Sequence, residues 1–144
     1  MQIFYVLATA WILIRGIGAL GVERFHDWIE ALRGALAVMF FVTASAHWGK
    51  RRQDLIRMVP FQQPGKLVTL TGIFEILGAI GLLLPSTTRT AAWCLAFLLI
   101  ALFPANVYAA RRNLSIGSTP VTPLPLRTGL QAVYIAALVT TAIA

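Results

Sequence analysis

Long apolar runs separated by short polar segments dominate the sequence. A helix that crosses a lipid bilayer needs about 20 apolar residues, and five runs reach or approach that length. They cover about 3–22, 31–48, 67–84 and 90–110, and the stretch from the prolines at 120, 123 and 125 to the last residue. The runs are continuously apolar, whereas the strands of a membrane barrel alternate over about ten residues. The pattern therefore predicts an all-α, polytopic membrane helix bundle with five spans.

The five runs form one unit. No internal repeat and no long linker divides the chain, so we expect a single integral membrane domain over residues 1–144. It divides into a four-helix core over about 31–144 and an additional N-terminal helix over about 3–22. Arg15 interrupts the N-terminal run, and the alternative to a fifth span is a tilted or partly interfacial helix. No basic segment precedes this run, which argues against a signal peptide.

Composition excludes most soluble classes. Hydrophobic residues make up 58% of the chain and charged residues 12%, whereas about 25% of the residues of an average soluble domain are charged. Twelve Lys and Arg against five Asp and Glu give a net charge of +7. The basic residues lie between the apolar runs, so we expect anionic lipid headgroups as their partner and no nucleic acid. A single cysteine, Cys94, excludes an intrachain disulfide.

The basic residues predict the orientation. Eight lie in the connections after the second and fourth runs, and only Arg24, Arg33 and Arg89 lie on the other side. The positive-inside rule places the eight in the cytoplasm, as expected for a multi-pass protein of a cell membrane, here a bacterial plasma membrane. We expect headgroup contacts from Lys50, Arg51, Arg52, Arg57, Arg111 and Arg112. The apolar and basic residues of 51–61 allow two interpretations: a segment lying along the headgroups, or a loop packed on the helix ends.

Two charged residues fall inside the apolar runs. Helical rise places both Arg15 and Glu75 near the midplane of the bilayer, where a charge costs about 2.5–3.5 kcal/mol. One interpretation is a structural ion pair between Arg15 and Glu75 that holds the first helix to the core. The alternatives are that Glu75 titrates or binds a ligand and that the long Arg15 side chain extends toward the interface. Glu75 also lies on a helix face of small residues, which predicts close packing: Thr71, Gly72, Gly78 and Ala79.

A second polar group lies toward the cytoplasmic side. His47 ends the second run, and Asn106 and Tyr108 follow Pro104 in the fourth. Together with Glu75 they form a candidate intramembrane polar or ligand site, in which His47 acts as a general base, a metal ligand or a hydrogen-bond partner of a quinone. The alternative is that His47 caps backbone carbonyls and the aromatic residues anchor the interface. Pro104 frees a carbonyl near residue 100, which a neighbour relieves or which bends the helix.

Standard catalytic chemistry is not evident. The two histidines, His26 and His47, lie on opposite sides of the membrane in this topology, which excludes a bis-histidine haem. The sequence has no phosphate-binding loop, metal-ligand cluster or nucleophile elbow. We therefore assign no catalytic residue, no metal and no cofactor, while a quinone stays open as a cofactor.

Three motifs stand out between residues 46 and 110: Ala46-His47-Trp48, the glycine-rich segment 70–78 that contains Glu75, and Phe103-Pro104-Ala105-Asn106. Together with the segments 57–60 and 81–85, they make residues 46–110 resemble the DoxX-like family of small bacterial and archaeal membrane proteins. It implies a four-helix membrane core, and it implies a link to quinone-coupled sulfur oxidation and to membrane oxidoreductase assemblies. The chain departs from the family in its additional N-terminal helix and in having no cysteine pair.

The sequence supports two main expectations about function. The first is a non-enzymatic subunit, scaffold or assembly factor of a membrane complex, with a membrane protein or a second copy of the chain as partner. The alternative is a quinone- or lipid-interacting subunit of a membrane oxidoreductase, with Glu75, His47, Asn106 and Tyr108 lining its pocket. A small transporter or proton path is a third class and requires Glu75 to face a water-filled cavity.

Overall fold

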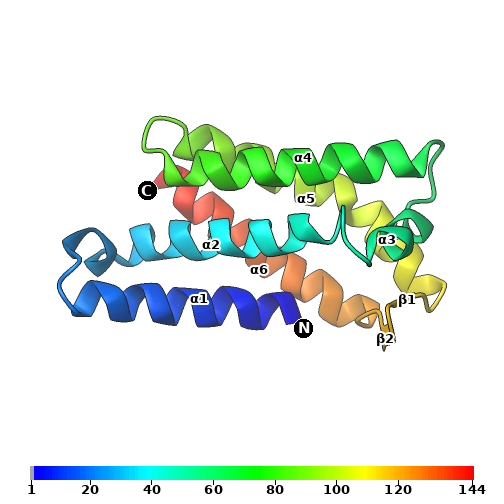
Figure 1. Ribbon diagram of the computed structural model, residues 1–144, viewed down its shortest axis with the longest axis horizontal. Coiled ribbons are helices and arrows are strands. Elements are labelled where there is room, and N and C mark those ends of the chain that lie inside the picture. The colour runs from blue at the N-terminus through cyan, green and yellow to red at the C-terminus, as the bar shows by residue number, and fades with distance from the viewer. Residues whose placement is uncertain (1) are drawn as a thin grey trace.

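The computed structural model describes residues 2–144 and is a bundle of helices (Figure 1). In chain order the elements are α1 (Gln2–Ala19), the 3-10 helix η1 (Glu23–His26), α2 (Trp28–Ser45), α3 (Arg52–Met58), α4 (Pro64–Leu83), α5 (Thr88–Arg111), β1 (Ser115–Ile116), β2 (Thr119–Pro120) and α6 (Leu124–Ile143). Five of these helices, α1, α2, α4, α5 and α6, are long and apolar enough to cross a membrane. The prediction of five helices with the length and apolar character of membrane spans is confirmed.

The five long helices lie side by side, and α2 is the central one (Figure 1). It packs against α1 on one side and α4 on the other; α5 packs against α4 and α6, and α6 returns to a smaller contact with α2. Half of α2 is buried inside the molecule, compared with 11% of α1. Helix α1 is therefore an outer helix attached to α2, while α2, α4, α5 and α6 enclose the interior.

Local sequence signals mark where the helices begin and end. The Asp27 carboxylate caps α2 by accepting a hydrogen bond from the backbone N–H of Ile29 at 2.9 Å. Pro64 stands in the first turn of α4, where its missing N–H costs no helical bond. The helix ends at Leu83, two residues before Pro85, which matches the predicted stop.

Small residues let α4 approach its neighbours closely. A Cβ atom on Gly78 would lie 2.4 Å from Leu95 of α5, and one on Gly81 would lie 2.7 Å from the Cβ of Ala91. Ala79 is fully buried. The predicted packing face of α4 is confirmed, since these contacts require the missing side chains.

The long connection between α2 and α4 packs on the bundle. It contains α3, whose Met58 is buried and whose Leu55 is half-buried. Asp54 of α3 accepts a hydrogen bond from the backbone N–H of Gly117 at 2.8 Å, in the turn between β1 and β2. Of the two interpretations of 51–61, the structure therefore has the segment packed on the helix ends.

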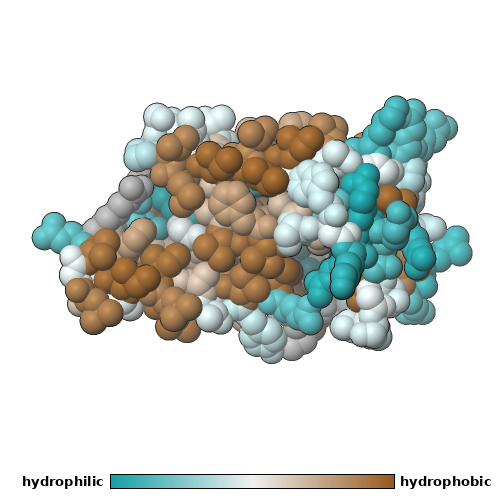
Figure 2. All heavy atoms as spheres, in the orientation of Figure 1, coloured by the Kyte–Doolittle hydropathy of each residue, from teal (hydrophilic) through white to brown (hydrophobic). Residues whose placement is uncertain are grey.

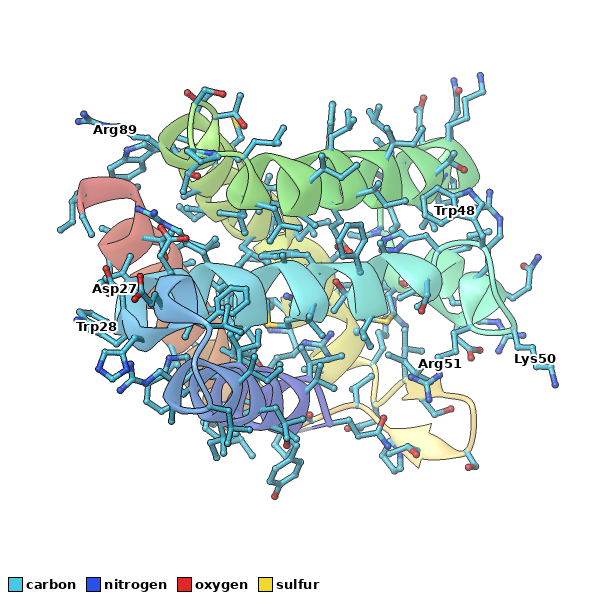
Figure 3. The ribbon with its side chains drawn as sticks, turned by 60° about the vertical axis from the view of Figure 1, so that its left-hand side comes forward. Asp27, Trp28, Trp48, Lys50, Arg51 and Arg89 are labelled. Atoms are coloured by element: carbon cyan, nitrogen blue, oxygen red, sulfur yellow. The ribbon has the colours of Figure 1, made fainter. Side chains whose placement is uncertain are left out.

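The surface divides into an apolar region and a polar end. Figure 2 shows brown, hydrophobic atoms over most of the visible face and teal, hydrophilic atoms gathered at the end that carries α3 and the hairpin. Large apolar side chains are widely exposed along the helices, including Leu13 (62%), Leu77 (59%) and Phe97 (64%). Trp48, Lys50 and Arg51 lie at the polar end and Asp27, Trp28 and Arg89 at the other (Figure 3). This is the pattern of a bundle that faces lipid along its length.

Candidate functional site

A cavity of about 600 Å³ lies between α2, α4, α5 and α6, in the half of the bundle nearest the polar end. Residues of α3, of the hairpin and of the first turn of α1 complete its wall. Most of the lining is apolar, with Met39, Phe40, Leu99 and Leu102 among it. Three of the four predicted site residues, His47, Glu75 and Asn106, line this one cavity although they come from distant parts of the chain.

Glu75 stands on the α2–α4 wall of the cavity and is 5% exposed. The Thr43 hydroxyl of α2 donates to its Oε2 atom at 2.7 Å. Nε2 of His47 lies 4.0 Å from its Oε1 atom. The carboxyl therefore has one direct hydrogen-bond donor and one imidazole at ion-pair distance, both contributed by the neighbouring helix and the turn that follows it.

The hydrogen bonds of His47 identify which ring nitrogen carries the proton. Nδ1 lies 3.3 Å from the carbonyl oxygens of both Thr43 and Ala44. A carbonyl only accepts, so Nδ1 donates and, in the neutral ring, Nε2 is the acceptor nitrogen on the side of Glu75. Burial lowers the pKa of His47 below its ordinary value, and the Arg52 charge acts in the same direction. The neutral form is favoured, with a lone pair available for a hydrogen bond.

Tight packing fixes the position of His47. A Cβ atom on Gly72 would lie 2.7 Å from the Cβ of His47 and 2.8 Å from the Trp48 ring, so only glycine leaves room for this turn. Arg52 donates from Nη1 to the His47 carbonyl at 2.8 Å and from Nη2 to Thr69 Oγ1 at 3.0 Å. These contacts hold the turn after α2 against α4.

The opposite wall, formed by α5 and α6, carries a chain of polar side chains. Arg127 donates to Asn106 Oδ1 at 2.8 Å, and Asn106 donates to Gln131 Oε1 at 3.0 Å. Gln131 in turn donates to the backbone carbonyl of Leu99 at 2.6 Å. Pro104 removes the helical donor of the residue 100 carbonyl, so this bond is made to the carbonyl next to the freed one and links α5 to α6 beside the proline.

The predicted ion pair between Arg15 and Glu75 is wrong. Arg15 donates to the backbone carbonyl of His26, near the far end of the bundle from His47. Gln2 and Ile3, at the start of α1, line the same cavity as Glu75. Arg15 therefore lies about 20 Å further along α1 than the level of the carboxyl. The prediction from the sequence assumed that α1 and α4 begin at the same level along the bundle axis. In the structure α4 begins nearer the polar end than α1 does.

Two other predicted residues have different roles. Tyr108 does not line the cavity; the guanidinium carbon of Arg112 lies 5.5 Å from the centre of its ring. Arg52 is half-buried, and both of its Nη atoms donate to protein oxygens, so it holds the fold and is not a free headgroup contact. The remaining residues of the predicted headgroup set are exposed: Lys50, Arg51, Arg57, Arg111 and Arg112.

Several polar residues of the cavity were not predicted from the sequence. Thr43, Arg127, Gln131 and Tyr134 are among them. Gln131 and Tyr134 are three residues apart in an apolar helix, a spacing that places them on one face. Beside Asn106, that spacing is a further signal in the sequence that indicates this wall.

The arrangement suits a molecule with a polar head and an apolar body. Two polar clusters face each other across an apolar cavity, with imidazole, carboxyl and hydroxyl groups on one wall and amide, guanidinium and phenol groups on the other. The volume falls in the range of small-molecule sites, about 300–1,000 Å³. Within residues 2–144 no group of three or more His, Cys, Asp or Glu side chains is placed to hold a metal ion.

Comparison with known proteins gives one match. No curated protein and no solved structure matches this sequence. One family model, described as Domain of unknown function (DUF8561), matches residues 36–142. The matched segment starts within α2 and ends in α6, so it covers the walls of the cavity and leaves α1 outside. The chain belongs to the family described as Domain of unknown function (DUF8561).

Proposed function

We propose that this protein is a multi-pass protein of a cell membrane that binds a lipid-soluble molecule with a polar head, a quinone or a lipid, in the cavity between α2, α4, α5 and α6. It acts by binding and catalyses no reaction of its own. The observation that carries the proposal is the convergence of His47, Glu75 and Asn106 on one apolar cavity. The evidence for a scaffold or assembly role is the composition alone. The two roles are compatible, because a subunit of a membrane complex can also bind a ligand.

The proposal includes a DoxX-like core made of α2, α4, α5 and α6, with α1 as an addition. Two observations support this division: these four helices enclose the cavity, and the family match starts within α2. The basic end faces the cytoplasm in the proposed orientation, because positively charged connections are retained there.

A cavity-filling variant tests the binding function. Ala105→Phe puts a ring into the cavity, whereas Ala101→Phe puts the same ring on the exposed side of α5. The purified protein in a neutral detergent is titrated with decylubiquinone and with phosphatidylglycerol, and binding is followed by the shift in thermal unfolding. We expect at least one compound to bind the unchanged protein and Ala101→Phe with similar affinity. We expect the affinity of the same compound for Ala105→Phe to be lower by about tenfold or more.

Two results count against the proposal. If neither compound shifts the unfolding temperature of the unchanged protein, the cavity is not a site for this class of molecule. If Ala105→Phe and Ala101→Phe bind equally, the compounds bind elsewhere on the apolar surface. Mass spectrometry of molecules that copurify in mild detergent gives an independent measurement, with the copurified amount expected to fall in Ala105→Phe alone.

A further inference from the structure

The charge of the cavity wall distinguishes between the ligands that the proposed function leaves open. Three formally basic residues line the cavity, Lys50, Arg51 and Arg127, against a single carboxyl, Glu75. Glu75 has Thr43 and His47 on its own wall. The excess charge on the lining is therefore positive, and Arg127 carries its part of that charge on the wall opposite Glu75.

Arg127 contributes the charge that most needs a partner. It is half-buried in the first turn of α6, and its Nη2 atom donates to the neutral amide of Asn106 at 2.8 Å. Among the side chains described within 2–23 and 25–144, Glu30 lies at ion-pair distance from Arg33, Asp54 from Arg57, and Glu75 from His47. No carboxylate of this part of the chain pairs with Arg127.

A guanidinium held without a counter-ion inside a bundle is costly unless a second group compensates its charge. Arg52, which is also half-buried, shows the alternative solution, because both of its Nη atoms are taken up by protein oxygens. Arg127 also lines the cavity, and the hydrogen bond described for its guanidinium is the one from Nη2 to Asn106. Its fork of N–H groups matches the oxygens of a carboxylate or a phosphate.

The rest of the lining indicates where the ligand begins and ends. Lys50 and Arg51 are exposed and lie at the polar end of the bundle (Figure 3). The deeper wall is apolar and includes Met39, Phe40 and Leu99. A molecule that enters from the polar end thus meets basic side chains first and apolar side chains further in.

We propose that the ligand of this cavity is an anionic lipid, whose phosphate or carboxylate oxygens bind Arg127, with Lys50 and Arg51 at the entrance, and whose acyl chain lies along the apolar wall. The proposal rests on the proposed binding function and specifies the charge of the ligand. A neutral quinone leaves the Arg127 charge uncompensated and is the poorer occupant. No covalent step is involved.

The test compares ligand charge and removes the Arg127 charge. The full chain in neutral detergent is titrated with phosphatidylglycerol, oleate, phosphatidylcholine, decylubiquinone and inorganic phosphate. We expect phosphatidylglycerol or oleate to bind most tightly, and Arg127→Gln to weaken that ligand by about tenfold or more. The control is Arg111→Gln, which removes an exposed charge at the same end of the bundle and is expected to change affinity less than about twofold.

The comparison between the titrated compounds identifies which kind of molecule supplies the anionic group. Tighter binding of phosphatidylglycerol assigns a phospholipid phosphate, and tighter binding of oleate assigns a fatty-acid carboxylate. Binding of inorganic phosphate as tight as that of either lipid overturns the lipid assignment. Arg127→Lys keeps the charge and is expected to recover part of the affinity. If Arg127→Gln folds poorly, the double variant Lys50→Gln and Arg51→Gln gives a second measurement, in which the affinity for the anionic lipid is expected to fall.

The failure of this inference differs from the failure of the proposed function. Three results together would show that the cavity is a ligand site without a preference for anions. In that case decylubiquinone binds as tightly as the anionic lipids, Arg127→Gln does not change the affinity, and Ala105→Phe still blocks binding. If no compound binds in a manner that Ala105→Phe weakens, the proposed function itself is wrong.

Discussion

At the scale of single residues, the cavity depends on a few positions at which no other amino acid fits without moving its neighbours. Gly72 is the clearest, because the turn that carries His47 rests directly on its Cα. Glu75 lies one helical turn further along α4 and meets Nε2 of the same histidine at 4.0 Å. A change at residue 72 therefore acts on both groups of this wall.

The first prediction concerns that contact. Gly72→Ala places a Cβ atom 2.7 Å from the Cβ of His47, so the turn must move away from α4. Overpacking of this kind costs typically about 1–3 kcal/mol of stability. We expect a lower thermal unfolding midpoint in detergent and weaker ligand binding. Gly129→Ala in α6 is the control, since a Cβ there meets no atom within 4 Å and alanine favours the helix.

Equal unfolding midpoints and equal ligand affinities for these two variants would show that the turn after α2 is free to move.

At the scale of helices, α5 and α6 are joined by polar side chains next to Pro104. Gln131 of α6 donates to the Leu99 carbonyl of α5. Asn106, two residues after the proline, accepts from Arg127 and donates to Gln131. The same side chains thus link the two helices and form the polar wall of the cavity.

The second prediction removes this link. Gln131→Leu leaves the Leu99 carbonyl without its side-chain donor and Asn106 without its acceptor. We expect a loss of about 1–2 kcal/mol in the free energy of unfolding, measured by denaturation of the purified protein in detergent. Thr140→Val on the same helix is the control, because its hydroxyl bonds only the Ala136 carbonyl of its own helix. A loss no larger than that of the control would mean that these side-chain bonds add nothing to the packing of α6 on α5.

At the scale of the whole molecule, the two ends differ in charge and thereby in their expected side of the membrane. On the face that Figure 2 shows, most of the hydrophilic surface lies at the end with α3 and the hairpin. The other end carries η1 and the short connection between α4 and α5. Helix α5 lies between that connection and the hairpin, so the proposed crossing of the bilayer by α5 puts the two on opposite sides.

The third prediction tests the orientation with cysteine labelling. Cys94 is replaced by alanine, and a single new cysteine is introduced by Ser118→Cys in the hairpin or Ser86→Cys after α4; both serines are exposed. In intact cells of a bacterial host, a membrane-impermeant maleimide is expected to label Ser86→Cys, and to label Ser118→Cys only after the cells are permeabilised. The reverse pattern would invert the topology, and labelling of both in intact cells would contradict a span between them.

Much of the fold could be predicted from the sequence, because a span is a local property. Hydrophobic length alone located five helices to within a few residues, and Pro64 and Pro85 marked the ends of α4. The small face of α4 was also readable, since helical periodicity places Gly72, Gly78 and Ala79 together. The concentration of basic residues in the connections at one end could also be predicted, because it follows from their order in the sequence.

The partners of the buried polar groups could not be predicted, because they depend on which helices are neighbours and on how far each is displaced along the bundle axis. Arg15 and Glu75 were matched by estimated depth, but α1 packs on α2 and begins beside the cavity, so the two charges lie far apart. Arg127 and Gln131 were not distinguished from other polar residues until α6 closed the cavity against α5.

The sequence by itself thus determined the membrane-spanning helices and the concentration of positive charge at one end, since both follow from residues close together in the chain. Only the tertiary structure decided that His47, Glu75, Asn106 and Arg127 share one cavity. In a bundle of apolar helices the hydrophobic effect does not select lateral neighbours; close packing and buried hydrogen bonds select them, and these involve residues that are distant in the sequence.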